Sequence, residues 1–449
     1  MPAFRSREGH RALVLGLGRT GVAVLRHLRR QGAFARGADR RADLPLPADL
    51  EEAADVEIRV GDEDATLLDG IDLVVPSPGV PATSPLLREA VSRGIPVVSE
   101  IELAARSLDV PLVAITGTNG KSTTTELVGA MLARAGRRPF VGGNLGTPLV
   151  DAVDGDFDVV VAEVSSFQLE WVESFRPSVG VFLNVSDDHL DRHGTLEAYA
   201  ALKARLFARQ GPSDFAILNR DDPLVAVLAS DLAARVETFG SSPGKGSGAS
   251  LVGNEIEVRT GDTTFRLSLA RSSLLGAHNR ENVMAAALAA HAAGAAPSAL
   301  QAALDDFRAL PHRMQVVHER AGVRYVDDSK GTNVGAVVRS LEGLPDGRTV
   351  LIAGGLSKGG DFSVARDVLA RKARRIVLYG RARDELERSW RGAAEIESHE
   401  DFGEAVRAAA VAARSGDLVL LSPACASQDQ FRDYAARGDA FATIVRTLP

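Results

Sequence analysis

The sequence predicts an α/β protein of several domains, and two observations carry this prediction. First, short apolar runs recur along the chain, each followed by a polar or glycine-rich turn and a helical pattern such as 21–30 or 122–135. These runs, which are typical of buried parallel strands, are RALVLGLG (11–18), VPLVAITG (110–117), FDVVVAEV (157–164), SVGVFLNV (178–185), RTVLIAGG (348–355), RRIVLYG (374–380) and GDLVLLSP (416–423). Second, the 449 residues exceed the roughly 250–300 at which a single core stops growing, so we expect two or three domains.

Two sequence features indicate where the domains meet. The segment SEIELAARSLDVP (99–111) is amphipathic and leads into an apolar strand, and Pro311 interrupts FRALPHRMQVV (307–317) where a new series of strands begins. We therefore place the domains at 1–102, 103–309 and 310–449. Within the second domain, a Gly/Ser-rich stretch at 240–250 predicts a mobile loop, and EIEVRTGDTTFRLSL (255–269) predicts a hairpin added to the sheet.

The composition is that of a soluble globular protein, with 45% hydrophobic and 25% charged residues. The 52 basic and 59 acidic residues give a net charge of −7 without a long basic run, which argues against extended nucleic-acid binding. No apolar stretch reaches the roughly 20 residues that cross a bilayer, and the N-terminus lacks the apolar segment of a signal peptide. The single cysteine, Cys425, fits a reducing compartment and is expected to be a buried small residue. We expect a cytoplasmic protein that binds neither nucleic acid nor membrane.

The first strand and helix carry a glycine pattern. VLGLGRTG places Gly16, Gly18 and Gly21 between them, and Asp39 follows eighteen residues after Gly21. By spacing alone this is a dinucleotide-binding fingerprint. The motif by itself shows only that a backbone turn can approach a phosphate closely, so a nicotinamide-dependent oxidoreductase stays open as an alternative at this point.

The segment AITGTNGKSTTTE (114–126) carries the strongest functional signal. Gly120, Lys121 and Ser122 match the end of the phosphate loop G-x-x-x-x-G-K-[ST], although Ile115 stands at its first glycine and Gly117 comes two residues later. The loop lies between an apolar strand and a helix whose unpaired N–H groups face it. Lys121 can neutralise the terminal phosphates and the Ser122 hydroxyl can bind Mg²⁺, so we expect ATP and Mg²⁺ here.

Three further residues are candidates for the metal site. Glu163 follows the apolar strand 159–162, so its carboxylate can emerge at the carboxyl edge of the sheet, where open α/β sheets bind ligands. His189, in NVSDDHLDRHG, is by itself more typical of a hydrogen-bonding loop residue, because Mg²⁺ prefers oxygen ligands. Lys203, in AYAALKARLF, is by itself typical of a solvated helix lysine.

The motifs taken together resemble one family. TGTNGKST, GGNLG, EVSSFQLE, DDHLDRH, GAHNRENV, LPHRM, DDSKGTNVGA and SPACASQDQF occur in this order and cover essentially the whole chain. They resemble the ATP-dependent Mur ligases of peptidoglycan synthesis. The resemblance implies an N-terminal Rossmann-like domain for a uridine nucleotide, a central P-loop-type α/β domain for ATP and Mg²⁺, and a C-terminal Rossmann-like α/β domain for an amino acid. The C-terminal motifs favour the branch that joins D-glutamate to UDP-N-acetylmuramoyl-L-alanine through an acyl phosphate.

Site residues follow from this resemblance, motif by motif. It implies ATP binding by Gly117, Thr118, Asn119, Gly120, Lys121, Ser122, Thr123, Asn279, Asn282, Arg313 and Asp328. It implies contacts to the uridine-nucleotide substrate by Arg19, Thr20, Asp39, Arg40, Ser77, Asn144 and His189, and to the amino acid by Thr332, Lys358, Ser427 and Tyr434. It implies catalytic roles for Lys121, His189, Lys203 and Lys330, and metal binding by Ser122, Glu163, His189 and Lys203, the last as a carbamate. Tyr434 stands where the family commonly has Phe, and Gln428 where it has Leu, so the amino-acid site departs from the family pattern.

We expect this ligase to act as a monomer. Three other functions are alternatives to it. A dehydrogenase explains the first glycine motif but not a second phosphate loop at 116–122. A nucleotide switch without enzymatic activity leaves the charged residues of the C-terminal block without a role. A folate polyglutamate ligase belongs to the same superfamily, but SPACAS and DDSKGTN favour the muramoyl branch.

Overall fold

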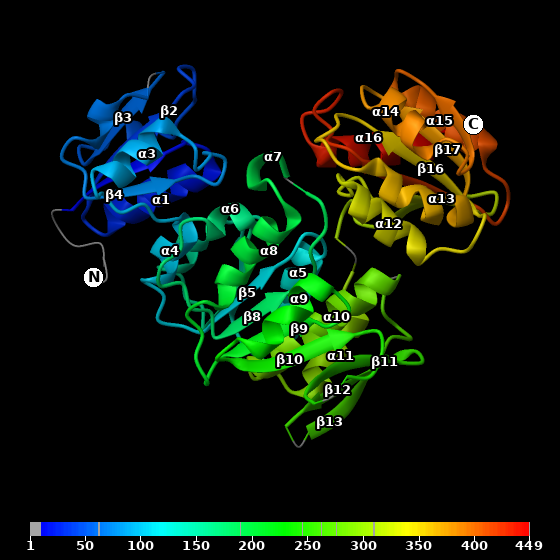
Figure 1. Cartoon of the computed structure of the whole chain (residues 1–449), viewed down its shortest axis with the longest axis horizontal. Coiled ribbons are helices and arrows are strands. Elements are labelled where there is room, and N and C mark those ends of the chain that lie inside the picture. Colours follow the sequence, from blue (N-terminus) through cyan, green and yellow to red (C-terminus); the bar gives the residue numbers. More distant parts are fainter. Residues whose placement is uncertain are drawn as a thin grey trace.

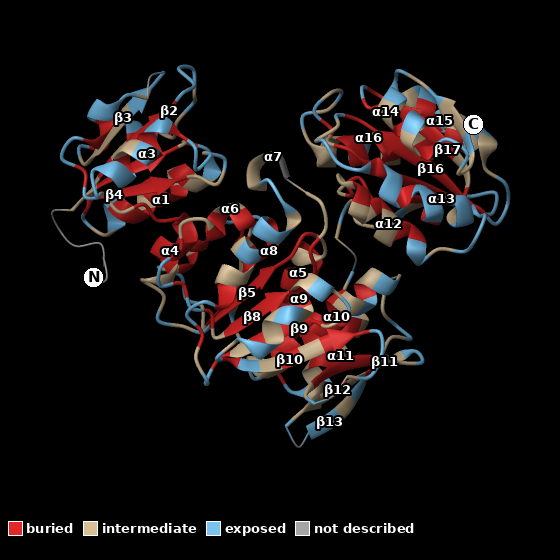
Figure 2. Ribbon diagram, viewed as in Figure 1, coloured by how far each residue is buried: buried red, intermediate tan, exposed pale blue. Residues whose placement is uncertain are grey.

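The computed structural model describes residues 10–61, 63–188, 190–244, 246–261, 263–274, 276–308 and 310–448. It has three lobes, each built around its own sheet (Figure 1). All seven apolar runs contain strands, namely β1, β5, β7, β8, β16, β17 and β19, as predicted. Figure 2 shows that the central strands form the buried interior of each lobe, while exposed residues lie on helices, on loops and on edge strands such as β13 (Thr263–Ser268). The described helices include none that is long and apolar enough to span a bilayer.

The first lobe is a four-stranded parallel sheet in the order β3-β2-β1-β4. Its elements are β1 Arg11–Leu15, α1 Arg19–Arg30, β2 Phe34–Asp39, α2 Ala48–Glu51, β3 Val56–Val60, η1 Ala65–Leu68, β4 Leu73–Pro76 and α3 Pro85–Ser92. The glycine motif lies in the turn from β1 into α1. A Cβ atom on Gly21 would lie 2.0 Å from the Gly16 carbonyl oxygen, so only glycine lets α1 pack this closely on the turn.

The central lobe holds nine strands in the order β13-β12-β11-β10-β9-β8-β5-β7-β6, parallel from β6 to β11 and antiparallel at β12 and β13. Its strands are β5 Leu112–Thr116, β6 Pro139–Gly143, β7 Val159–Glu163, β8 Val179–Phe182, β9 Phe215–Asn219, β10 Arg235–Gly240, β11 Gly248–Val252, β12 Glu255–Thr260 and β13 Thr263–Ser268. Its helices are α4 Glu100–Ala105, α5 Lys121–Arg134, η2 Leu149–Ala152, α6 Ser166–Leu169, α7 Leu190–His193, α8 Leu196–Ala204, η3 Arg205–Phe207, α9 Pro223–Ala226, η4 Val227–Ser230, α10 Ala277–Ala292 and α11 Pro297–Asp306.

Two predictions about the end of this sheet have different outcomes. The predicted hairpin is confirmed, because β12 and β13 pair antiparallel. The loop predicted at 240–250 is too long, because Gly248 to Ser250 already pair with Thr238 to Gly240 of β10. Backbone pairing with a neighbouring strand overrides the loop preference of a Gly/Ser-rich sequence.

The third lobe has six strands in the order β14-β15-β19-β16-β17-β18, of which only β14 is antiparallel to its neighbour. Its elements are β14 Gln315–Arg320, β15 Val323–Asp327, α12 Val334–Glu342, β16 Thr349–Gly354, η5 Phe362–Ala365, α13 Arg366–Lys372, β17 Ala373–Tyr379, α14 Arg383–Trp390, β18 Glu395–Ser398, α15 Phe402–Ala412, β19 Leu418–Ala424 and α16 Tyr434–Arg446. Cys425 is buried as expected, and burial raises the pKa of its thiol to about 12.

Candidate active site

The phosphate loop connects β5 to the fourteen-residue helix α5, as the sequence predicts. Gly120 precedes the helix with a φ of +85°, and no side chain caps the first turn. A Cβ atom on Gly120 would lie 2.2 Å from Oδ1 of Asn282 on α10, so the loop is closely packed on that side. The uncapped N–H groups at the start of α5 are therefore available to an anion.

Asn184, which the motif analysis did not single out, holds this loop in place. The residue follows β8 and is only 2% exposed. Its side chain accepts a hydrogen bond from the Asn119 amide at 2.9 Å and donates one to the Asn119 carbonyl at 3.0 Å. Its own carbonyl accepts from the Thr118 amide at 2.9 Å. A buried asparagine directly after an apolar strand is the sequence signal that could have identified it.

Two lysines converge on the same loop. Lys121 Nζ donates to the carbonyls of Gly117 and Thr118 at 2.9 and 2.8 Å. Lys203 Nζ, on α8, donates to the Gly117 carbonyl at 3.0 Å. Burial lowers the pKa of both ammonium groups, and for Lys203, which is 1% exposed, the neighbouring Lys121 charge lowers it further. The expectation of a solvated helix lysine, drawn from the local sequence, is therefore wrong, because α8 packs this side chain against the loop.

Glu163, at the end of β7, links the loop to the region beside β6. Its carboxylate accepts hydrogen bonds from Ser122 Oγ at 2.5 Å and from Asn144 Nδ2 at 2.6 Å. Burial alone raises the pKa of this carboxyl, but the Lys121 charge and these two bonds outweigh it, so the net shift is downward. Arg313, from the C-terminal lobe, also donates to Ser122 Oγ at 2.6 Å.

The donor set fits a magnesium ion. Ser122 and Glu163 place a hydroxyl and an ionised carboxylate side by side at the start of α5, and Mg²⁺ prefers oxygen ligands. His189, the third expected ligand, lies outside the described residues. Among the residues that the structure describes, no three His, Cys, Asp or Glu side chains form a metal-binding group by themselves. Any ion here would therefore need ligands beyond the carboxylate of Glu163, such as hydroxyl, carbamate or phosphate oxygens.

A cleft between the central and C-terminal lobes brings together most of the expected ATP residues. Its lining includes Asn119, Gly120, Thr123, Asn279, Asn282, Arg313, Asp328 and Lys330, with His278, Arg339 and Ser340 in addition. Burial raises the pKa of Asp328 to about 6, although Ser340 and Ser422 each donate to it at 2.8 Å. Burial lowers the pKa of Lys330 to about 8, and its Nζ lies 3.9 Å from the centre of the Tyr434 ring.

The residues expected to hold the amino acid divide into two groups. Thr332 and Lys358 line a small pocket with Asp187 and Asp188 of the central lobe. Lys358 Nζ lies 3.1 Å from Asp188 Oδ1, and Asn333 Nδ2 donates to Oδ2 of the same carboxylate at 3.2 Å. The Lys358 ammonium group is thus already paired with a carboxylate of the chain itself, that of Asp188. Ser427 is buried and Tyr434 stands beside Lys330, and neither is among the residues that line this pocket.

All six described residues expected to contact the uridine nucleotide line one cleft of about 500 Å³ between the first two lobes, namely Arg19, Thr20, Asp39, Arg40, Ser77 and Asn144. Asp39 accepts from the Leu17 amide at 2.8 Å and forms an ion pair with Arg41 at 2.9 Å, which lowers the pKa of its carboxyl. Ser77 Oγ donates to the Gly16 carbonyl at 2.6 Å. Both residues therefore brace the glycine turn at the edge of the cleft.

Known proteins match the chain over nearly its whole length. The Mur ligase MurD-like N-terminal domain matches residues 10–99, the Mur ligase middle domain 115–290, and the Mur ligase glutamate ligase domain 312–425. The UDP-N-acetylmuramoylalanine–D-glutamate ligase of Syntrophus aciditrophicus is 44% identical over 99% of both chains, and that of Pelotomaculum thermopropionicum is 46% identical over 98% of both. The structure of a pseudomurein peptide ligase type C from Methanothermus fervidus has the same fold, with a TM-score of 0.64 at 19% identity over 98% of this chain and 100% of that one. These matches rule out the oxidoreductase considered from the first glycine motif. The chain belongs to the Mur ligase family, on the branch of the UDP-N-acetylmuramoylalanine–D-glutamate ligases.

Proposed function

We propose that this chain joins D-glutamate to UDP-N-acetylmuramoyl-L-alanine and converts ATP to ADP and phosphate in doing so. The observation that carries the proposal is the position of Glu163. Its carboxylate bonds Ser122 of the phosphate loop on one side and Asn144 of the nucleotide-sugar cleft on the other. Reactive groups held at these two sites would therefore meet at one carboxylate, as a phosphoryl transfer between them requires.

In the first step, an oxygen of the L-alanyl carboxylate attacks the γ-phosphorus of ATP, the bond to the β,γ-bridging oxygen breaks, and ADP leaves. Lys121 and the uncapped N–H groups of α5 stabilise negative charge on the transferred group. Mg²⁺, held by Ser122 and Glu163, would supply further positive charge at the phosphates. In the second step, the neutral amine of glutamate attacks the acyl phosphate, and the phosphate and a proton leave.

Lys203 takes part as a carbamate in this proposal. A carbamate forms when a neutral amine attacks CO₂ and loses a proton. The lowered pKa of Lys203 favours the neutral amine, and the neighbouring Lys121 charge favours a modification that turns this amine into an anion. The carbamate would then supply a further oxygen ligand for Mg²⁺ beside Glu163, and His189 is proposed as another ligand.

The C-terminal lobe supplies the amino-acid side of the site. Thr332 and Lys358 are proposed to bind a carboxylate of D-glutamate, with Ser427 and Tyr434 as further contacts. The carboxylate would displace Asp188 from Lys358, since both bind the same ammonium group. Lys330, whose pKa of about 8 leaves it largely protonated at neutral pH, is proposed to stabilise the transferred phosphate. We further propose that the enzyme is monomeric and works in the cytoplasm.

A product assay tests this function. Phosphate release is followed with ATP, UDP-N-acetylmuramoyl-L-alanine and a panel of amino acids that includes both enantiomers of glutamate, and products are identified by mass spectrometry. We expect turnover only when all three substrates are present, D-glutamate as the preferred amino acid, and none with the control variant Lys121→Ala. Phosphate release that ignores the amino acid, or a product that contains a different one, would rule out the assignment.

A further inference from the structure

A hollow of about 440 Å³ lies on the C-terminal lobe and shares no lining residue with the three clefts of the active site. It is bordered by the β14–β15 hairpin and by helices α15 and α16. Much of its lining is aliphatic, with Val323 from the sheet, Val411 from α15, and Ile444 and Leu448 from the end of the chain described. Val411 is 89% exposed, which leaves an apolar side chain in water at the rim.

The polar side chains of this hollow include two cations and a tyrosine, and no lining residue is acidic. Within the described residues, the Arg407 side chain has no hydrogen bond or ion pair, and the Arg320 side chain donates to the Leu448 carbonyl but pairs with no carboxylate. The Tyr325 side chain is buried, at 4% exposure for the residue, and its hydroxyl has no hydrogen-bond partner there. Arg320 and Tyr325 both line this hollow, from the two strands of the hairpin. The hollow thus combines an apolar wall with two arginines that pair with no carboxylate among the described residues, in a chain of net charge −7.

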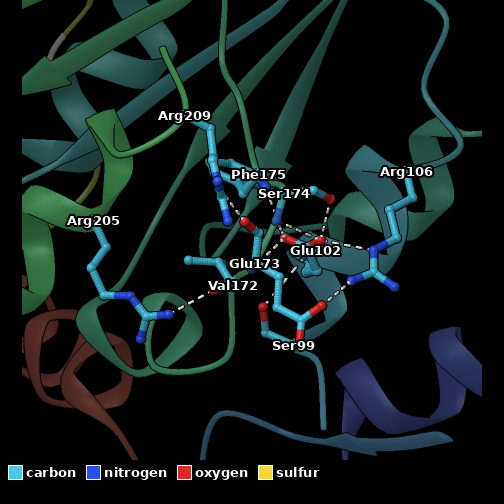
Figure 3. A network of polar contacts seen from close by, with 9 residues as sticks. All are labelled: Ser99, Glu102, Arg106, Val172, Glu173, Ser174, Phe175, Arg205 and Arg209. Carbon is cyan, nitrogen blue, oxygen red and sulfur yellow. Dashed lines mark hydrogen bonds and ion pairs between the residues drawn. The ribbon is translucent and has the colours of Figure 1, made fainter. Parts of the chain in front are cut away.

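A second arginine-lined hollow shows the contrast. It lies on the central lobe and is lined by Arg176, Arg205 and Arg209. Unlike the first hollow, this one has an acidic residue, Glu173, in its lining. Arg176 pairs with Asp214, while Arg205 and Arg209 donate to the carbonyls of Val172 and Glu173 (Figure 3). Those guanidinium groups fasten the segment after α6, whose amides also donate to buried Glu102.

We propose that the hollow between the β14–β15 hairpin, α15 and α16 binds a small organic anion with an aromatic or branched apolar body. Its charged group meets Arg407 and Arg320 and accepts a hydrogen bond from the Tyr325 hydroxyl. Its apolar body covers Val323, Val411 and Ile444. A neutral apolar ligand leaves the two cations unused, and a cation is repelled by them, so charge complementarity selects an anion.

The probe for the test is 1-anilinonaphthalene-8-sulfonate, an aromatic sulfonate that fluoresces when it leaves water. We expect one saturable site per chain, binding that excess ATP does not displace, and at least a tenfold weaker affinity in both Val411→Glu and Arg407→Glu. Val227→Glu is the matched control, because Val227 is a 65% exposed valine on the central lobe, and it should bind like the parent. Thermal melting of each variant shows that the fold is retained.

Four results overturn the proposal. Absence of saturable binding would show that the site does not exist. Displacement by ATP, or an affinity of Val411→Glu and Arg407→Glu equal to that of the parent, would show that the probe binds elsewhere. Analytical sedimentation tests whether a second copy of the chain binds this hollow. If the parent chain is a dimer and Val411→Glu is a monomer, a second copy covers this face instead of a small anion. The test uses neither D-glutamate nor the nucleotide sugar, so it stands or falls separately from the proposed ligase activity.

Discussion

Asn184 offers a direct test of how the phosphate loop is positioned. Asn184→Ala removes the two side-chain hydrogen bonds to Asn119, at 2.9 and 3.0 Å, and leaves the lysines and Ser122 of the site unchanged. A hydrogen bond contributes about 0.5–1.5 kcal/mol net, so the pair stabilises this loop conformation by about 1–3 kcal/mol. Because ATP has to bind the ordered loop, its affinity should fall by about 5- to 150-fold, at 1.4 kcal/mol for each factor of ten.

Gln210→Ala is the matched control for this change. Gln210 is also a buried amide that donates two hydrogen bonds, to the carbonyls of Pro177 and Phe215 at 2.9 Å each, but it does not contact the loop. Both variants should melt at a lower temperature than the parent, whereas only Asn184→Ala should bind ATP more weakly by isothermal titration calorimetry. If Asn184→Ala loses stability but keeps the parent's ATP affinity, its bonds to Asn119 support only the fold, and the positioning argument is refuted.

Three further predictions concern single side chains. Lys203→Ala should lose most of its ligase activity, and a short carboxylic acid added to the buffer should restore part of it by replacing carbamate oxygens, which an activity titration with acetate measures. Lys358→Ala should raise the KM for glutamate by about 10- to 150-fold, because a hydrogen bond to a charged group is worth about 1.5–3 kcal/mol. The KM values for ATP and the nucleotide sugar should change little. Equal changes in all three KM values would contradict this prediction. Burial raises the pKa of Glu237 from 4.5 to about 7, so its contribution to stability is complete below pH 4.5 and is lost as the pH rises through 7. Glu237→Gln should therefore leave stability in urea nearly unchanged at pH 4.5 and increase it by roughly 3 kcal/mol at pH 8, and an equal change at both values would show that this carboxyl does not titrate as described.

The sequence by itself determined those features that depend on neighbouring residues along the chain. Apolar runs bounded by turns gave the positions of the strands, because burial on both faces of a parallel sheet requires continuous apolar side chains. Gly120, Lys121 and Ser122 identified the phosphate loop, because the backbone turn, the charge and the helix start all lie within a few residues. The glycine spacing at 16–21 predicted a close turn of the first strand into its helix. This is confirmed, because the Gly16 carbonyl oxygen lies only 2.0 Å from the position that a Cβ atom on Gly21 would take.

Only the tertiary structure decided which distant residues share an environment. Lys203 has the local sequence of a surface lysine, yet packing of α8 buries it and lowers its pKa. Asn184 and Asp188 lie beside ordinary strand and loop residues in the sequence, but they meet Asn119 and Lys358 across 65 and 170 positions of chain. The physical reason is that burial and electrostatic interactions depend on distance in space. Local sequence fixes backbone preferences, whereas the solvent exposure of a charge and the identity of its partner are set when sheets and domains pack together.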